Sequence, residues 1–359
     1  MKAALISLGS TSSEMVATAM KKYFTEVDVL HLKNIEVTLG KECGIFYEGK
    51  PLGHYDCVYV KGSFRFANLL RSIAALLEGK VPYMPLPASS FTTIHNKLLT
   101  HLMLQQYNIP MPKTYVSSTT EAARNLLKRV SYPIVMKFPE GTQGKGVMFA
   151  ESFSSASSLL DALGALNQPF IIQEYVETNG TDIRALVVGD KVVAAMRRRA
   201  QREEKRSNIH AGGVGEQIQL PREVTNLAID TARALGVDIC GVDILESPLG
   251  PKVIEANISP GLQGLSKVTP VDLADEIAKF LFSKTEEVLQ QKKKQEAAKA
   301  MRELNLYNED PQEIITALLF RGERILLPEF VTKLTEFNER REYVVRAQKG
   351  KVEIREFKI

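Results

Sequence analysis

The sequence predicts a protein of mixed α/β (α+β) class, with a small N-terminal α/β domain and a C-terminal helix-plus-hairpin extension. Three observations support this prediction. Short apolar runs alternate with helical patterns over residues 1–88, as in a small sheet with parallel strands. Strand patterns and hairpin turns dominate residues 134–257, and the final part of the chain is strongly charged.

The N-terminal part divides into strands and helices of ordinary length. The predicted strands are residues 3–8, 27–32 and 55–60, and the predicted helices are residues 12–24 and 66–77. The repeated prolines of residues 81–87 then interrupt both helix and strand, so they mark a domain boundary. A further helix is expected over residues 93–106.

The middle of the chain combines strands with glycine-rich loops. A strand at 134–138 runs into the loop 141–146 and at once into a strand at 147–150. This strand, loop, strand order weakens a P-loop or dinucleotide-binding interpretation, in which a helix follows the loop. The later predicted elements are a strand at 170–176, a hairpin of 182–188 with 192–196, helices at 223–235, 271–282 and 286–304, and a hairpin of 343–346 with 352–357.

Composition excludes several classes of protein. The 359 residues are 44% hydrophobic, which suits a globular protein of two or three domains. The 46 basic and 42 acidic residues give a net charge of +4, so bulk charge does not indicate nucleic-acid binding. Cys43, Cys57 and Cys240 lack metal or disulfide spacing, and no segment resembles a signal peptide or a membrane span. We therefore expect a cytoplasmic protein.

A hairpin at residues 242–257 is the most informative feature. Its turn, residues 246–251, lies midway between Asp243 and Glu255. Residues at equal distance from a turn face each other, and positions i and i+2 share a face, so Asp243, Glu255 and Asn257 should converge. Three oxygen donors suit Mg²⁺, which commonly shares its ligands with phosphates. The competing interpretation is a hairpin with ordinary polar residues on its solvent face.

Other polar groups fit a phosphate site less specifically. Glycines in the loop 141–146 allow backbone N–H groups to approach anions, although such a loop is also an ordinary hairpin turn. Lys137 ends an apolar strand, where it needs an anion or must reach solvent. Arg206 and Asn208 lie in a loop that is either ligand-binding or merely exposed, and His210 shows no catalytic spacing.

Taken in order, these motifs resemble the ATP-grasp superfamily and, within it, the RimK-type α-L-glutamate ligase family. The resemblance covers residues 1–285 and is densest at residues 137–144, 173–175, 181–184, 206–208, 240–245 and 255–262. It departs at Ala211 and at Val60-Lys61, both on the side of the acceptor and the amino acid. It implies the domains 1–88 (N-terminal), 89–176 (central, with the glycine-rich loop) and 177–285 (C-terminal, with the metal site). Residues 286–359 form an extension that exceeds the usual family length and that the resemblance does not cover.

The resemblance also implies a role for each matched residue. The metal ligands would be Asp243, Glu255 and Asn257, and the catalytic residues would be Arg206 and Lys137. The residues that bind the nucleotide would be Lys97, Lys137, Glu140, Gly141, Thr142, Gly144, Gln173, Glu174, Tyr175, Val176, Asp182, Arg206, Ser207 and Asn208. The cofactors implied are ATP and Mg²⁺, with two ions expected and Mn²⁺ as a substitute.

The implied activity is an ATP-dependent carboxylate-amine ligase that forms an amide through an acyl phosphate. The leading interpretation is addition of L-glutamate to the C-terminal carboxylate of a protein, of the ribosomal-protein type. The alternatives are ligation of glutamate or another amino acid to a pterin or deazaflavin coenzyme or to an amino-carrier protein, and a non-catalytic adaptor. We expect a homo-oligomer, no membrane partner, and contact with nucleic acid only through a ribosome. The basic run Lys292–Lys294 is either a solvated face or a recruiting surface.

Overall fold

The computed structural model describes residues 1–41, 43–140, 146–199, 214–303, 318–322, 324–328, 331–332, 335–339 and 341–357. The chain forms two compact units, Met1–Glu296 and Ala297–Ile359, which are described separately. Among the described residues, no helix is long and apolar enough to cross a membrane. The four-domain division predicted from the sequence stays a prediction.

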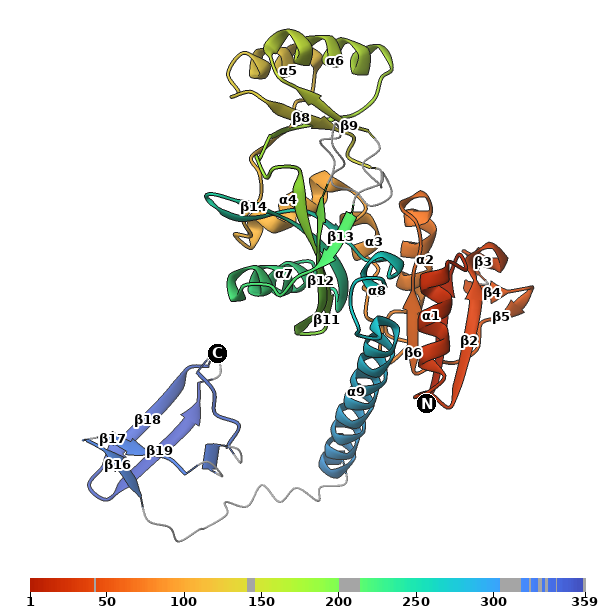
Figure 1. The fold of residues 1–359 in the computed structure, drawn as a ribbon. Coiled ribbons are helices and arrows are strands. Elements are labelled where there is room, and N and C mark those ends of the chain that lie inside the picture. The colour runs from red at the N-terminus through yellow and green to blue at the C-terminus, as the bar shows by residue number, and fades with distance from the viewer. Residues whose placement is uncertain are drawn as a thin grey trace. The chain divides into compact units, whose positions relative to one another are not determined.

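Unit 1 begins with a parallel sheet of the order β2-β1-β6 (Figure 1). Its strands are β1 (Lys2–Ser7), β2 (Glu26–His31) and β6 (Cys57–Val60), and its first helices are α1 (Thr11–Met20) and α2 (Ala67–Leu77). These confirm the predicted strands and helices within a few residues. The sequence patterns missed a small antiparallel sheet of β3 (Ile35–Thr38), β4 (Gly44–Tyr47) and β5 (Lys50–Pro51), whose strands are short and mostly half-exposed or exposed.

The proline-rich segment 81–87 is packed rather than free. Tyr83 is 6% exposed, and its hydroxyl donates to the carboxylate of Asp238 at 2.7 Å. The backbone of Tyr83 accepts from Val58 on β6, while the carbonyl of Pro85 accepts from Asp238. The segment therefore bridges the N-terminal sheet and the start of a later strand.

A second sheet has the antiparallel order β7-β10-β8-β9. Its strands are β7 (Thr114–Tyr115), β8 (Ile134–Lys137), β9 (Val147–Ala150) and β10 (Ile171–Glu174), and it carries α5 (Thr120–Leu127) and α6 (Phe153–Ala165). Ile134, Met136 and Ile172 pack with these two helices in a separate core. Because side chains alternate along a strand, Val135 and Lys137 lie on the other face of the sheet.

The third sheet has the antiparallel order β13-β12-β11-β14-β15. Its strands are β11 (Thr181–Val188), β12 (Lys191–Arg199), β13 (Val214–Gln217), β14 (Ile239–Ser247) and β15 (Gly250–Asn257). Helix α7 (Arg222–Ala234) packs against this sheet. The basic run Arg197–Arg199, which the sequence pattern placed after a hairpin, belongs to β12.

The remaining helices of unit 1 are α3 (Ser90–Thr93), α4 (Lys97–Gln106), α8 (Gln263–Ser266) and α9 (Leu273–Glu303), and two 3₁₀ turns are η1 (Leu32–Asn34) and η2 (Phe64–Phe66). The two helices predicted at 271–282 and 286–304 are one continuous helix, α9. No glycine or proline separates them, and Thr285 is buried with its hydroxyl donating to the carbonyl of Leu281 at 2.6 Å.

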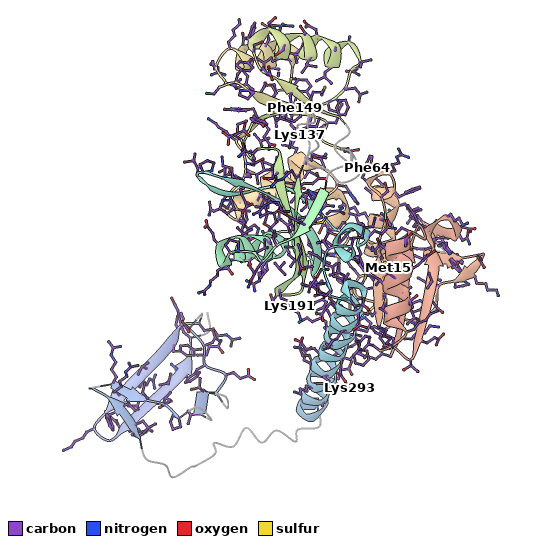
Figure 2. The ribbon with its side chains drawn as sticks, in the orientation of Figure 1. Met15, Phe64, Lys137, Phe149, Lys191 and Lys293 are labelled. Atoms are coloured by element: carbon purple, nitrogen blue, oxygen red, sulfur yellow. The ribbon has the colours of Figure 1, made fainter. Side chains whose placement is uncertain are left out.

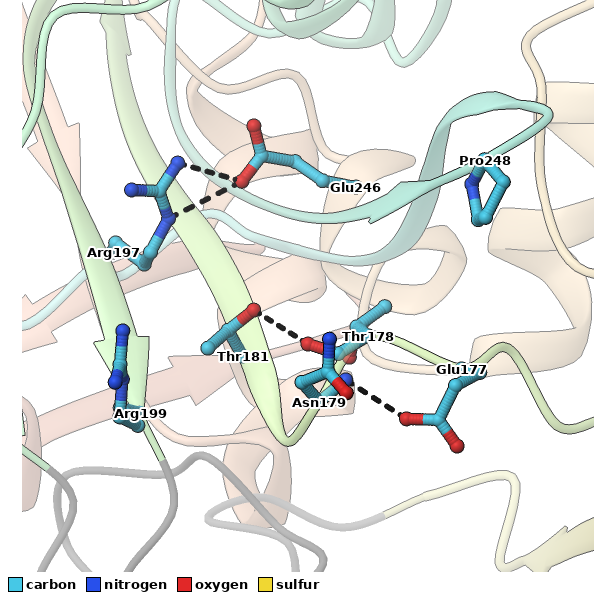
Figure 3. Close-up of a pocket in the computed structure, with 8 residues that line it drawn as sticks. All are labelled: Glu177, Thr178, Asn179, Thr181, Arg197, Arg199, Glu246 and Pro248. Carbon is cyan, nitrogen blue, oxygen red and sulfur yellow. Dashed lines mark hydrogen bonds and ion pairs between the residues drawn. The ribbon is translucent and has the colours of Figure 1, made fainter.

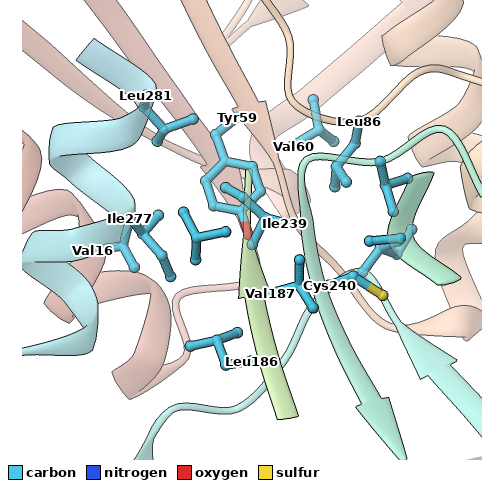
Figure 4. Packing of buried hydrophobic residues seen from close by; sticks show 14 of the residues in the cluster. Val16, Tyr59, Val60, Leu86, Leu186, Val187, Ile239, Cys240, Ile277 and Leu281 are labelled. Carbon is cyan, nitrogen blue, oxygen red and sulfur yellow. The ribbon is translucent and has the colours of Figure 1, made fainter. Parts of the chain in front are cut away.

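The main core of unit 1 joins its first and third sheets (Figure 4). Tyr59 and Val60 of β6 lie beside Val187 of β11 and Ile239 of β14, and Leu281 of α9 closes the cluster. All five side chains are at most 1% exposed. The contact fixes the carboxyl end of β6 relative to the strands that carry the polar residues described below.

Unit 2 contains two hairpins. They are formed by β16 (Leu319–Arg321) with β17 (Arg324–Leu326) and by β18 (Tyr343–Gln348) with β19 (Lys351–Glu356). The second confirms the hairpin predicted around Lys349-Gly350. Asp310-Pro311, a sequence typical of a helix N-cap followed by proline in the first turn, lies outside the described residues.

Candidate active site

The predicted hairpin of β14 and β15 brings Asp243 opposite Glu255. Its turn runs from Ser247 to Gly250, and pairing from this turn alone would set Asp243 opposite Ile254. A β-bulge shifts the register between Asp243 and Ile244, so that Ile254 is the extra residue and Glu255 becomes the partner. The convergence of Asp243 and Glu255 is therefore confirmed, and the bulge is its cause.

Asp243 also pairs with Arg184 of β11, so that Arg184, Asp243 and Glu255 form one row across three strands. The Arg184 guanidinium donates from Nε to Oδ1 at 2.7 Å and from an Nη to Oδ2 at 2.6 Å. Arg198 of β12 reaches the same Oδ2 at 2.9 Å and also forms an ion pair with Asp182. Two buried carboxylates thus share two arginines.

These ion pairs set the charge state of Asp243. Burial raises the pKa of the carboxyl, but the guanidiniums of Arg184 and Arg198 outweigh it and hold the pKa below its ordinary value. Asp243 is therefore an anion at neutral pH. Although Arg198 is also buried, the two carboxylates around it raise the pKa of its guanidinium.

The oxygens of the expected metal ligands retain room for a cation. Oδ1 of Asp243 accepts one hydrogen bond, and Oδ1 of Asn257 accepts one from the backbone N–H of Ser259 at 2.8 Å, so each keeps a lone pair. The described residues offer the Glu255 carboxylate no hydrogen bond or ion pair. They also contain no group of three or more His, Cys, Asp and Glu side chains suited to a metal. A cation here would need oxygens from a substrate as well, as Mg²⁺ commonly does.

Lys137 lies near Glu255 of this row, and Lys97 lies near Lys137. Asn96 caps α4 through its side-chain oxygen, which accepts from the backbone N–H groups of Leu98 and Leu99, and so makes Lys97 the first helical residue. The backbone N–H of Lys97 donates to the carbonyl of Pro139 at 2.8 Å, which joins the start of α4 to the segment after Lys137. The two lysines are thereby held close together.

Figure 2 labels Lys137 at the end of β8. The residue is 8% exposed, and the described residues supply its ammonium with no hydrogen bond or ion pair. Burial lowers the pKa of Lys137 to about 8; the charge of Glu255 opposes this shift, and the charge of Lys97 adds to it. These electrostatic effects place Lys137 near both Glu255 and Lys97. An anionic ligand would relieve the cost of this burial.

The residues predicted as an adenine hinge follow β10. Gln173 is buried, and its amide donates to the Thr114 hydroxyl at 2.8 Å, which is a structural role. Glu174 forms an ion pair with Lys252 of β15 at 2.7 Å. The Tyr175 ring packs edge-on against Phe149, with 6.0 Å between centroids, and Val176 is half-buried. Two aromatic rings thus lie near the sheet face that carries Lys137.

The remaining expected site residues come from two loops. Glu140 is exposed at the end of its segment. The other expected residues of the two loops, Gly141, Thr142, Gly144, Arg206, Ser207 and Asn208, lie outside the described residues.

The sequence patterns missed three residues that help to build the site. Arg184 was visible as the position two after Asp182, which shares its strand face. Arg198 was hidden by a second bulge, which shifts the pairing of β11 and β12 between Leu186 and Val187 and sets Asp182 opposite Arg198. Without that shift Arg197 would face Asp182. Nothing in the sequence distinguished Phe149 from an ordinary aromatic residue of a strand.

A pocket of about 620 Å³ lies near the hinge on the opposite face of the third sheet (Figure 3). Arg197 and Arg199 line it, and Arg197 forms an ion pair with Glu246 at 2.9 Å. Strand alternation separates these side chains from the row of Arg184, Asp243 and Glu255. The pocket is therefore distinct from the candidate active site.

Comparison with protein families decides the assignment. A family model described as a RimK-like ATP-grasp domain matches residues 94–281, more than half of the chain. The chain belongs to the RimK-like ATP-grasp family. It is an ATP-grasp ligase, and ATP and Mg²⁺ are the cofactors of its family.

Curated relatives agree with this assignment. A probable alpha-L-glutamate ligase of Vibrio atlanticus is 36% identical over 259 residues, which are 71% of this chain and 86% of that protein. The ribosomal protein bS6–L-glutamate ligase of Escherichia coli is 38% identical over 241 residues, 66% of this chain and 80% of that protein.

Solved structures confirm the predicted ATP-grasp fold. The ATP-grasp ligase PsnB, solved with a minimal precursor, Mg and ADP, has a TM-score of 0.62 at 19% identity and covers 79% of this chain and 98% of its own. A RimK domain protein of Sphaerobacter thermophilus has a TM-score of 0.60 at 19% identity and covers 78% of this chain and 99% of its own.

Proposed function

We propose that this ligase joins the α-amine of L-glutamate to the C-terminal carboxylate of a protein. The names of the relatives support glutamate as the amine and a protein tail as the acceptor. The observation that supports the reaction is the row of Arg184, Asp243 and Glu255 beside the buried Lys137. This arrangement supplies oxygen donors for a cation and an ammonium for a phosphate.

The reaction proceeds in two balanced steps. In the first, an oxygen of the acceptor carboxylate attacks the γ-phosphorus of ATP, and ADP leaves with the electron pair of the broken P–O bond. In the second, the amine nitrogen attacks the acyl carbon, inorganic phosphate leaves, and the nitrogen loses a proton. Positioning and electrostatic stabilisation dominate such phosphoryl transfers, so no serine, cysteine or histidine nucleophile is required.

The residues of the chain divide this work. Two Mg²⁺ ions, which Mn²⁺ can replace, would be held by Asp243, Glu255 and Asn257 and would offset phosphate charge. Lys137 and Lys97 stabilise phosphate oxygens from the other side. Arg184 and Arg198 hold Asp243 ionised and correctly oriented. We assign Arg206, with Ser207 and Asn208, to the moving phosphoryl group, and Asp182 to orienting Arg198 at the nucleotide site.

The nucleotide would lie against the face of the second sheet that carries Lys137. Phe149 and Tyr175 offer apolar ring surface to a planar base, while the backbone of Glu174 to Val176 offers it polar groups. The ion pair of Glu174 with Lys252 ties this hinge to the metal hairpin. Glu140, Gly141, Thr142 and Gly144 would close over the phosphates and exclude water from the acyl phosphate.

The test is mass spectrometry of candidate acceptors after incubation with ATP, Mg²⁺ and a mixture of amino acids. We expect a glutamyl increment on the C-terminus of a protein, with one ADP released for each bond formed. A mass increment on a pterin, a deazaflavin or an amino-carrier protein would show that the acceptor is a different molecule and that the type of reaction is as proposed. ATP-independent labelling, or no ADP release with any acceptor, would refute the proposal. The assembly state and the role of unit 2 stay predictions.

A further inference from the structure

Lys61 is a second buried lysine, at the end of the N-terminal sheet. It follows β6, and its backbone N–H donates to the carbonyl of Ile6 at 2.8 Å. The residue is 3% exposed, and no described residue forms a hydrogen bond or an ion pair with its ammonium. Its contact is a cation–π one, with Nζ 5.6 Å from the centre of the Tyr59 ring.

The environment of Lys61 contains no compensating charge among the described residues. Burial lowers the pKa of Lys61 to about 8, and no neighbouring charge contributes to this shift. Burying an ammonium without an anion destabilises the fold, so such a group is retained where a ligand completes it. Lys137, at the candidate active site, is also buried without a described hydrogen bond or ion pair, although the charge of Glu255 acts on it.

The topology places Lys61 where parallel sheets bind ligands. From β1 the chain passes through α1 to β2 on one side, and it later returns to β6 on the other side of β1. The strand order therefore reverses between β1 and β6. Ligands of open α/β sheets bind outside the carboxyl ends of the strands at such a switch point. Lys61 lies at this position, directly after β6, and residues 8–10 follow the neighbouring strand β1.

Two hydrogen bonds connect the segment after β6 to the candidate active site. The N–H of Gly62 donates to the Ser259 hydroxyl at 3.0 Å, and the N–H of Ser259 donates to the side chain of Asn257 at 2.8 Å. The same loop is held to α1, since the N–H of Leu262 donates to the Ser12 hydroxyl at 2.9 Å. A Cβ on Gly62 would lie 2.6 Å from Leu70, so glycine permits this close packing.

We propose that Lys61, at the carboxyl ends of β1 and β6, binds a non-reacting carboxylate of a ligase substrate. This inference rests on the proposed function. Among the described residues no second cation acts on Lys61, and a single ammonium matches a monoanionic carboxylate better than a phosphate, which carries more charge. The carboxylate can come from the incoming amino acid or from the acceptor, and the experiment separates these sources.

The test compares Lys61→Met and Lys61→Arg with Lys80→Met, which removes an exposed lysine of the same region. Initial rates are measured while ATP, L-glutamate and an acceptor are varied in turn. In Lys61→Met, KM for one carboxylate substrate should rise roughly tenfold or more, because a charge-assisted hydrogen bond is lost. KM for ATP should change by less than about twofold, because the free energy of a twofold change is only a fraction of that of one charge-assisted hydrogen bond. Lys61→Arg should recover part of the loss.

A rise for L-glutamate assigns the subsite to the amino acid, and a rise for the acceptor assigns it to the acceptor. Unchanged values for both, or an equal rise for ATP, would overturn the inference. Thermal denaturation gives an independent readout: Lys61→Met should melt higher than wild type, because an uncompensated buried charge is replaced by an apolar chain of similar length. A lower melting temperature with no change in KM would show a purely structural lysine.

The inference and the proposed function can fail separately. If wild type turns over no substrate, thermal shift by L-glutamate alone, and by the acceptor alone, still tests the subsite. Stabilisation of wild type that is absent in Lys61→Met supports the subsite, whereas equal shifts in both proteins, or none in either, contradict it.

Discussion

The carboxylate of Asp243 is bound through both oxygens by the guanidinium of Arg184, at 2.7 and 2.6 Å. Asp243 is also one of the three expected metal ligands. We therefore propose two roles for Asp243, to hold a cation and to neutralise Arg184 and the buried Arg198. Glu255, its cross-strand partner, has no described hydrogen bond or ion pair, so substitutions of these two acids should have different consequences.

Asp243→Asn should abolish turnover and also weaken the fold. Removing one partner of a buried ion pair leaves uncompensated charge and costs about 3–5 kcal/mol. The comparison is Glu246→Gln, which breaks the half-exposed pair with Arg197 and should cost less than about 1 kcal/mol. Chemical denaturation of both variants measures the difference. Equal destabilisation would contradict the described burial of the Asp243 pair.

Glu255→Gln should abolish turnover and leave stability unchanged. The amide keeps the shape of the side chain but removes the negative charge that a cation requires. We expect at least about a hundredfold loss of kcat, since charge stabilisation in phosphoryl transfer is worth several kcal/mol. The melting temperature should match that of wild type. Wild-type rates of ADP release would refute the metal assignment.

Catalysis should depend on pH through Lys137. Its pKa is lowered to about 8 in the folded protein, so the ammonium is charged below that pH and is lost as pH rises through it. Accordingly, kcat/KM for ATP should fall above about pH 8, because this ratio reports groups of the free enzyme. Lys137→Arg, whose charge persists, should remove this decline, and a profile still falling near pH 8 would exclude Lys137 as its source.

The same shift predicts how stability changes in alkali. An unfolded lysine titrates near about 10.4, so between about pH 8 and this value the unfolded chain binds more protons than the folded chain. Lys137 should therefore make the unfolding free energy rise with pH in this window. Lys137→Met should flatten that rise in urea titrations, and an unchanged slope would contradict the burial of a lysine without a partner.

Truncation after Glu296 should leave unit 1 folded and active on small substrates. Val288 is the last described hydrophobic residue of α9 that packs against the core of unit 1, so this truncation removes no described residue of that core. A matched truncation after residue 285 would remove Val288 and should lower the melting temperature. If the chain truncated after Glu296 loses turnover of the acceptor protein but keeps turnover of small substrates, unit 2 recruits the acceptor. If it also loses turnover of small substrates, unit 2 supports the ligase itself.

The part of the site that could be predicted is the part that depends on the alternation of side chains along the strands of one hairpin. The pairing of Asp243 with Glu255 followed from a turn midpoint at 249, yet the turn itself is centred between Pro248 and Leu249, and Ile254 supplies the missing residue. A bulge leaves no mark that propensity can detect, so the prediction was correct for an incomplete reason. The network of Arg198 with Asp182 depended on the other bulge and was not predicted.

Longer-range features were also beyond the sequence pattern. Lys61 followed an apolar strand, but its burial arises from packing between two sheets that are distant in the sequence. The prolines of residues 81–87 correctly indicated an interruption, and only the contacts of Tyr83 with Asp238 show that the interruption is packed.

The bulge at Ile254 divides its hairpin into two parts that differ in their tolerance to inserted residues. Between the bulge and the tip, the strands carry no expected metal ligand, and Leu249 at the tip is 89% exposed. Residues inserted at the tip lengthen the loop without changing which residues face each other beyond the bulge. The tip is therefore a suitable place for a fluorophore or an affinity tag on a working enzyme. Deletion of Ile254 would remove the bulge and, by the count from the turn, would still leave Glu255 opposite Asp243.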